Sequence, residues 1–279
     1  MKKSIIALFS VLLIVVLAAC GGSDDKESAE PDEDGVTKLV VGASSVPHGE
    51  VLEEAKPMLE EENIELEIEP YEDYVLPNDD LDNGTLDANY FQHIPYLEQT
   101  IEDTGYDLTH IGGVHIEPMG VYSTSFDDID EVPDGTEVLL SNSVADHGRI
   151  LGLFENEGII TLKDDVDLEE ATLDDIEENP KDLEFVADVD PAILPEYYEK
   201  EKDTLVVINT NYAIEAGLNP LEDALIIEGE DSPYVNVLAV RAEDEDNEAL
   251  NKLIEVLHSE EIQDFITEKY EGAVVPVSN

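Results

Sequence analysis

Short apolar runs and alternating segments indicate where this chain forms strands. Residues 38–43 (KLVVGA) and 205–208 (LVVI) have the continuous apolar character of parallel strands that are buried on both faces. Ile64, Leu66 and Ile68 instead alternate with glutamates, which predicts a strand with one face in the core and the other in solvent. Further strands are predicted at residues 135–140, 183–186 and 235–240.

Apolar residues at helical spacing separate these strands. A helix is predicted over residues 49–62, with Val51, Leu52, Ala55 and Leu59 on its buried face. Another is predicted over residues 149–157, and two more near the C-terminus carry their apolar residues within 250–257 and 262–266. Strands that alternate with helices pair in parallel, so the sequence predicts an α/β fold.

Residues 74–98 concentrate aromatic, amide and turn-forming residues. Pro77 opens a short predicted helix that Gly84 ends, and a strand then leads to His93, just before the next helix. Ligands of open α/β sheets gather at the carboxyl ends of strands. Tyr74, Phe91 and His93 are therefore the predicted wall of a pocket, whereas strand alternation should turn Tyr90 away from Phe91.

The order of elements predicts two lobes with a ligand cleft between them. Residues 37–123 form the first part of lobe 1, and residues 116–123 are expected to be a strand that leaves it. Lobe 2 is predicted at residues 124–231, and residues 232–279 return to lobe 1, so the chain crosses twice. No internal sequence repeat is present, which argues against a solenoid.

The charge of the chain is strongly one-sided. Its 279 residues include 70 acidic and 13 basic ones, for a formal net charge of -57. This charge excludes nucleic acid and anionic membrane surfaces as direct partners. Because the acids are scattered through every segment, we interpret them as a solvated acidic surface. Molar salt screens such repulsion, so we infer a salt-loving source organism.

The first 20 residues have the pattern of a bacterial lipoprotein signal. Two lysines precede an apolar run, and Leu17-Ala18-Ala19-Cys20 has the form of a lipobox, where Cys20 would be acylated. The run is shorter than the ~20 residues of a membrane-spanning helix. Cys20 is the only cysteine, so no disulfide can form within one molecule. Residues 21–36, rich in Gly, Ser, Asp and Glu, are predicted to be a disordered tether.

The segment that begins at Asp73 contains a long ordered motif: Asp73-Tyr74-Val75, Pro77-Asn78, Leu81, Gly84, residues 87–93 (DANYFQH) and Pro95-Tyr96-Leu97. This motif resembles that of a known family, the methionine-binding lipoproteins that deliver their ligand to ABC importers. Similar segments are VPH at 46–48, EPMGVYS at 117–123, INTNYA at 208–213 and SPYVN at 232–236. The resemblance implies a two-lobed, type II-like periplasmic-binding-protein fold.

The resemblance also implies binding residues in lobe 2 and at its boundary. Only two arginines exist, and Arg241 is expected in a surface ion pair. Arg149 corresponds to the family's carboxylate-binding arginine, and Asn209 and Asn236 lie in intact family motifs. Asp146 departs from the family, which has asparagine there. This aspartate would either bind the ligand ammonium or neutralise Arg149.

The resemblance implies a monomeric, lipid-anchored receptor on the extracytoplasmic face of the membrane. It would capture methionine, without a cofactor or metal, for an ABC permease and ATPase. Another amino acid or a short peptide remains an alternative cargo. A metal receptor is less favoured because none of the six histidines has a tight metal-ligand spacing. An enzyme lacks support because no nucleophile elbow or phosphate loop is present.

Overall fold

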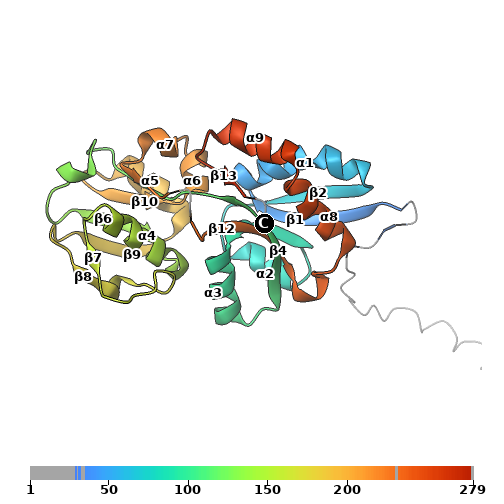
Figure 1. Cartoon of the computed structure of the whole chain (residues 1–279), viewed down its shortest axis with the longest axis horizontal. Coiled ribbons are helices and arrows are strands. Elements are labelled where there is room, and N and C mark those ends of the chain that lie inside the picture. Colours follow the sequence, from blue (N-terminus) through green and yellow to red (C-terminus); the bar gives the residue numbers. More distant parts are fainter. Residues whose placement is uncertain (1–28, 30, 33–34, 230–231, 278–279) are drawn as a thin grey trace, which may run out of the picture.

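The strands of the protein form two main sheets, one in each lobe. The computed structural model describes residues 29, 31–32, 35–229 and 232–277. The predicted signal sequence, Cys20 and most of the predicted tether lie outside the described residues. A six-stranded sheet and a five-stranded sheet lie next to each other, each with helices packed around it (Figure 1). The predicted two-lobed α/β fold is confirmed.

The first sheet has the strand order β13-β4-β12-β3-β1-β2. Its strands are β1 (Thr37–Ser44), β2 (Ile64–Tyr71), β3 (Ala88–His93), β4 (Leu108–Ile116), β12 (Val235–Arg241) and β13 (Val275–Pro276). β1 pairs in parallel with β2 and β3, and β12 runs antiparallel between β3 and β4. The strand-helix-strand pattern at the start of the chain thus gives the parallel pairing that it predicted.

Helices cover both faces of this sheet. The helices are α1 (Glu50–Glu61), α2 (Leu76–Asp82), α3 (Ile94–Thr104), α8 (Glu248–Leu257) and α9 (Glu260–Tyr270). The predicted apolar face of α1 is fully buried and shares one core with α8 and α9. A second core contains Leu81 of α2 and Leu97 of α3, together with Val237 of β12. The alternating residues of β12 therefore pack into two different cores.

The second sheet has the order β11-β5-β10-β6-β9. Its strands are β5 (Gly120–Tyr122), β6 (Glu137–Ser141), β9 (Glu184–Val189), β10 (Leu205–Ile208) and β11 (Ile226–Ile227). Around it lie α4 (Val144–Asn156), α5 (Leu194–Lys200), α6 (Thr210–Glu215), α7 (Pro220–Asp223) and a small sheet of β7 (Thr161–Leu162) and β8 (Ile176–Glu178). Short helical turns are Ser45–Gly49, Ile129–Glu131, Leu173–Asp175, Pro191–Ile193 and Ala242–Asp244. No helix among the described residues is long and apolar enough to cross a membrane.

The first crossover lies earlier in the chain than the predicted boundary after Ser123. β4 ends at Ile116, and β5 already pairs antiparallel with β10 and β11 of the second sheet. The predicted single strand over residues 116–123 is therefore divided, and residues 117–119 carry the chain across. The return passes between β11 and β12. Within the described residues the chain thus moves between the main sheets twice.

Two local predictions are wrong. α4 begins at Val144 rather than near Arg149, so Asp146 and Arg149 lie one turn apart on the same helix. Arg241 is buried rather than at the surface, because it donates hydrogen bonds to the carbonyls of Leu81 and Leu86 and pairs with Asp244. Its role is to hold lobe 1 together.

Candidate ligand-binding site

The residues of the candidate site lie at strand ends of both sheets, between the two lobes. In lobe 1, β3 ends at His93, β4 ends just before Glu117, and antiparallel β12 begins beside them, with Asn236 paired to His93. A register shift follows Asn236, and bulges of this kind redirect side chains near binding sites. In lobe 2, β10 ends just before Asn209. The residues that follow or precede these strands therefore meet between the lobes.

A small cavity, partly open to solvent, lies at this meeting point. Its lining is Tyr74, Phe91, Gln92, His93, Tyr96, Glu117, Asp146, Arg149, Asn209, Thr210, Asn211 and Asn236. The structure thus brings all seven residues of the predicted site to one cavity.

One side of the cavity is aromatic. The ring centroid of Tyr74 lies 5.9 Å from that of Phe91 and 6.0 Å from that of Tyr96. Tyr74 is held across the cleft, because its hydroxyl donates to Asn211 Oδ1 at 2.7 Å. Tyr90 is fully buried, does not line the cavity, and contacts His115 instead. This wall can hold an apolar or thioether side chain.

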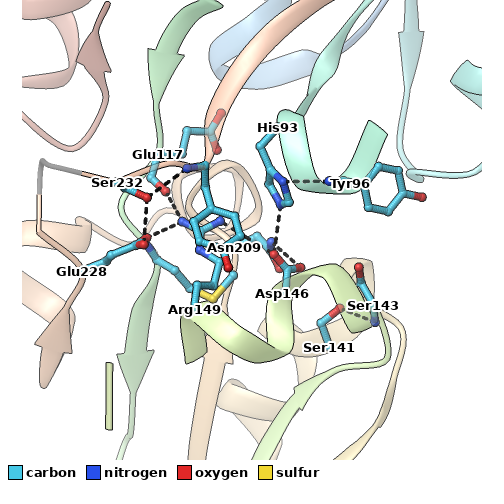
Figure 2. Close-up of polar contacts among 12 residues, drawn as sticks. His93, Tyr96, Glu117, Ser141, Ser143, Asp146, Arg149, Asn209, Glu228 and Ser232 are labelled. Atoms are coloured by element: carbon cyan, nitrogen blue, oxygen red, sulfur yellow. Dashed lines mark hydrogen bonds and ion pairs between the residues drawn. The ribbon is translucent and has the colours of Figure 1, made fainter. Parts of the chain in front are cut away.

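Arg149 is the guanidinium of the site, and Figure 2 shows it between Glu228 and Asp146. Its NH2 group forms a close ion pair with Glu228 and donates to the Glu117 carbonyl at 2.9 Å. Its NH1 group lies 3.7 Å from Asp146 Oδ1, and the guanidinium carbon lies 4.5 Å from the ring centre of Tyr234. The Arg149 side chain therefore contacts both segments that connect the lobes.

Asp146 receives hydrogen bonds from both lobes. His93 Nδ1 accepts from the backbone N–H of Tyr96, so His93 Nε2 carries the proton and donates to Asp146 Oδ1 at 3.1 Å (Figure 2). Asn209 Nδ2 donates to the other carboxylate oxygen at 3.3 Å. The bond from His93, together with Arg149 and Asn209, lowers the pKa of Asp146 despite its burial. Asp146 is thus an ionised, oriented carboxylate.

A second buried carboxylate, Glu117, lies at the first crossover. Its Oε1 is 2.8 Å from His115 Nε2 and 3.2 Å from His48 Nε2, and its Oε2 accepts from the Asn211 N–H at 3.0 Å. Burial raises the pKa of Glu117, and it lowers the pKa of His48 to about 4 and that of His115 to about 3. Both imidazoles are therefore neutral at neutral pH, and His115 donates a hydrogen bond to Glu117.

His48, His115 and Glu117 also have donor atoms within 4.8 Å of one another, close enough to hold a metal ion. His115 instead hydrogen-bonds to Glu117 at 2.8 Å, and His48 hydrogen-bonds to Asn236 Oδ1 at 3.0 Å. The group therefore has a role without a metal, which is to orient Glu117 and Asn236 at the edge of the cavity.

Two buried polar atoms of the lining have no hydrogen-bond partner. They are the Nε donor of Arg149 and the Oδ1 acceptor of Asn209. Buried polar groups are nearly always paired, so these two atoms mark places where a ligand can bond. The cavity thus offers one free donor for an anionic group and one free acceptor for a cationic group, next to an aromatic wall.

Several lining residues were absent from the sequence prediction. Glu117 and Asn211 lie within segments that carry the family resemblance. The resemblance therefore pointed to these segments, but it did not indicate that these two side chains line the cavity. Glu228, which does not line the cavity but pairs with Arg149, also gave no signal, because one glutamate among 70 acidic residues is indistinguishable from the background. Its importance follows only from its contact with Arg149.

Known proteins resemble this chain over nearly all of its length. Residues 39–278 match the family model described as NlpA lipoprotein. The chain is 44% identical over 280 residues to the methionine-binding lipoprotein MetQ of Bacillus subtilis, with 100% of both chains covered.

Solved structures agree in fold. A nutrient-binding protein from Burkholderia cenocepacia bound to methionine is 37% identical, with a TM-score of 0.81 over 86% of this chain and 100% of that one. A periplasmic substrate-binding protein of an ABC transporter from Coxiella burnetii is 36% identical, with a TM-score of 0.80 and the same coverage.

Proposed function

The chain belongs to the NlpA lipoprotein family, and from this membership we propose that it is a receptor that captures methionine for an ABC importer. Relatives named as methionine-binding lipoproteins match 94% to 100% of the chain, and one solved relative holds methionine in a fold of the same type. The proposal makes the protein a binding protein and not an enzyme.

The observation that carries the proposal is the pair of unpartnered atoms beside an aromatic wall. Free methionine has a carboxylate that needs a donor, an ammonium that needs an acceptor, and an apolar thioether. Arg149 Nε supplies the donor and Asn209 Oδ1 the acceptor. Tyr74, Phe91 and His93 surround the thioether in this proposal, while Asp146 and Asn236 complete the polar end.

We further propose that the protein is anchored outside the cytoplasm by acylation of Cys20. The family description as lipoproteins and the lipobox support this anchor. Residues 21–36 then act as a tether between the membrane and β1. The protein would bind as a monomer and present its closed lobes to a permease and ATPase.

A thermal-shift screen in molar salt tests the proposed ligand. The mature chain is melted alone and with L-methionine, D-methionine, the other amino acids, dipeptides containing methionine, and Zn²⁺. A ligand at 100 times its dissociation constant stabilises the protein by about 2.7 kcal/mol. We expect the largest shift with one isomer of methionine. No shift with either isomer, combined with a clear shift for another compound, would replace methionine as the cargo.

A further inference from the structure

Tyr74 belongs to lobe 1, yet its side chain packs against a core of lobe 2. The buried residues of this core come from β5, β6, β9, β10, α5 and α6. Among the described residues, Tyr74 is the one member of lobe 1 that packs against it. Tyr74 also contacts Phe91 of β3, so the aromatic wall of the cavity is built partly on the opposite lobe.

Tyr212 of α6 holds Tyr74 from the side of lobe 2. Its ring centroid lies 5.0 Å from that of Tyr74, and the two ring planes are tilted by 30°. Its hydroxyl donates to the main-chain carbonyl of Glu72 at 3.0 Å. Glu72 directly follows β2 and lies two residues before Tyr74. One side chain of lobe 2 therefore contacts both the Tyr74 ring and the backbone that carries it.

The position of Tyr212 separates it from the ligand. Asn211, the residue before it, lines the cavity and accepts a hydrogen bond from the Tyr74 hydroxyl at 2.7 Å. Tyr212 is buried, and it does not line the cavity. Any effect of Tyr212 on binding must therefore act through Tyr74 and through the contact between the lobes.

We propose that Tyr212 is a positioning residue that holds the lobes closed around the ligand. The lining of the cavity comes from both lobes and is only partly open to solvent, so methionine enters and leaves while the lobes are apart. The bond to Glu72 and the contact with Tyr74 then form after entry and break before release. An interaction made only in the closed arrangement shifts the equilibrium toward that arrangement.

The consequence is kinetic. Tyr212 slows the dissociation of methionine and leaves its association unchanged, because the interactions of Tyr212 with lobe 1 are absent while the ligand enters. This inference rests on the proposed function, since it takes methionine as the ligand whose release is slowed.

Tyr212→Phe tests the inference, because it removes the hydroxyl and keeps the ring against Tyr74. In molar salt, calorimetric titration gives the dissociation constant for methionine, and stopped-flow fluorescence gives the two rate constants. The chain contains no tryptophan, so the emission of the tyrosines in the cavity wall can be followed directly. We expect dissociation to be about fivefold faster, as for the loss of one hydrogen bond, with unchanged association and an affinity weaker by the same factor.

Two further variants locate the effect. Tyr212→Leu should release methionine faster still, because it also loses the ring contact with Tyr74. Tyr198→Phe is the matched control, since Tyr198 of α5 packs against the same core and contacts Tyr122 of the same lobe. It should release methionine at the rate of the parent protein. Melting curves without ligand show that each variant is folded.

The outcomes separate this inference from the function on which it rests. If folded Tyr212→Phe releases methionine at the parent rate, the inference is overturned while the methionine receptor stands. Slower association with unchanged dissociation would also overturn it, because Tyr212 would then act on the entry of the ligand. If the parent protein itself binds no methionine, the proposed function fails, and the inference fails with it.

Discussion

Replacing Arg149 by alanine tests the centre of the site. The Arg149 side chain is 4% exposed and connects three parts of the molecule, since it lies on α4 and contacts Glu117 at one crossover and Glu228 at the other. Removing the guanidinium leaves Glu228 without its partner and leaves Asp146 with only its bonds to His93 and Asn209. It also removes Arg149 Nε, the unpartnered N–H donor of this side chain in the cavity lining.

The structure sets the size of the effect. Removing one partner of a buried ion pair costs about 3–5 kcal/mol, because the other charge stays buried without compensation. The unpaired Glu228, whose side chain is 16% exposed, lowers the stability of the free and the bound protein alike. The loss of affinity comes from the ligand carboxylate, because truncating one partner of a buried, hydrogen-bonded charge pair costs about 2–5 kcal/mol of binding free energy. At about 1.4 kcal/mol for each factor of ten, the lower part of this range means that methionine binds roughly 100-fold more weakly.

Calorimetric titration in molar salt measures this loss, and a melting curve without ligand shows whether the variant is folded. Arg149→Lys keeps the charge but loses the planar guanidinium. Its affinity for methionine should therefore lie between that of the parent and that of Arg149→Ala. Lys163→Ala is the matched control, because it removes one positive charge from an exposed ion pair in the same lobe. A folded Arg149→Ala variant that binds methionine like the parent would refute the reasoning.

Four further predictions concern other parts of the protein. Cys20→Ala should move the protein from the membrane fraction to the soluble fraction, and a variant that stays membrane-bound would contradict lipid anchoring. Lowering salt from about 1 M to about 0.01 M lengthens the Debye length from about 3 to about 30 Å, so the melting temperature should fall sharply; an unchanged value would argue against the halophile inference. Phe91→Ala should weaken methionine binding roughly tenfold, as titration would show, because it removes a wall of the cavity; parent-like affinity would place Phe91 outside the contact surface. Burial lowers the pKa of His115 to about 3 in the folded protein. As the pH falls below ~6.5, the His115 imidazole is therefore protonated only in the unfolded chain, and the free energy of unfolding decreases. Melting curves from pH 7 to 5 should show a smaller decrease in His115→Gln than in the parent, whereas exposed His110→Gln should match the parent; equal decreases would contradict this assignment.

Elements whose local hydrophobic pattern agrees with their tertiary packing were predicted correctly from the sequence. The apolar residues of α1 and β10 are buried as their spacing predicted, because each element packs its whole apolar face against a core. β4 was missed since it contains Gly112 and Gly113, a pair that is typical of turns. Both positions are closely packed, because an added Cβ would lie 2.7 Å from Ile254 at Gly112 and 2.5 Å from Val235 at Gly113.

The start of α4 was misplaced for a related reason. Its first turns carry Asp146 and His147, which are buried although they are polar, and Val144, which is 53% exposed although it is apolar. Hydrophobic periodicity is therefore absent where the helix faces the cavity. The predicted start near Arg149 marks the point at which α4 begins to pack into the core of lobe 2, with Ile150 and Leu151.

The position of the first crossover could not be predicted from local pattern, yet it determines how the site works. β5 has three residues, and its partners β10 and β11 follow more than 80 residues later in the chain, so only long-range pairing assigns it to lobe 2. The result places Glu117 at one crossover, and Glu228 next to the other. Arg149 contacts both, while Asp146 on the same helix accepts from His93 of lobe 1. A ligand that bonds to Arg149 and Asn209 must therefore interact with a network that already joins the lobes, so its binding energy acts directly on the closed arrangement.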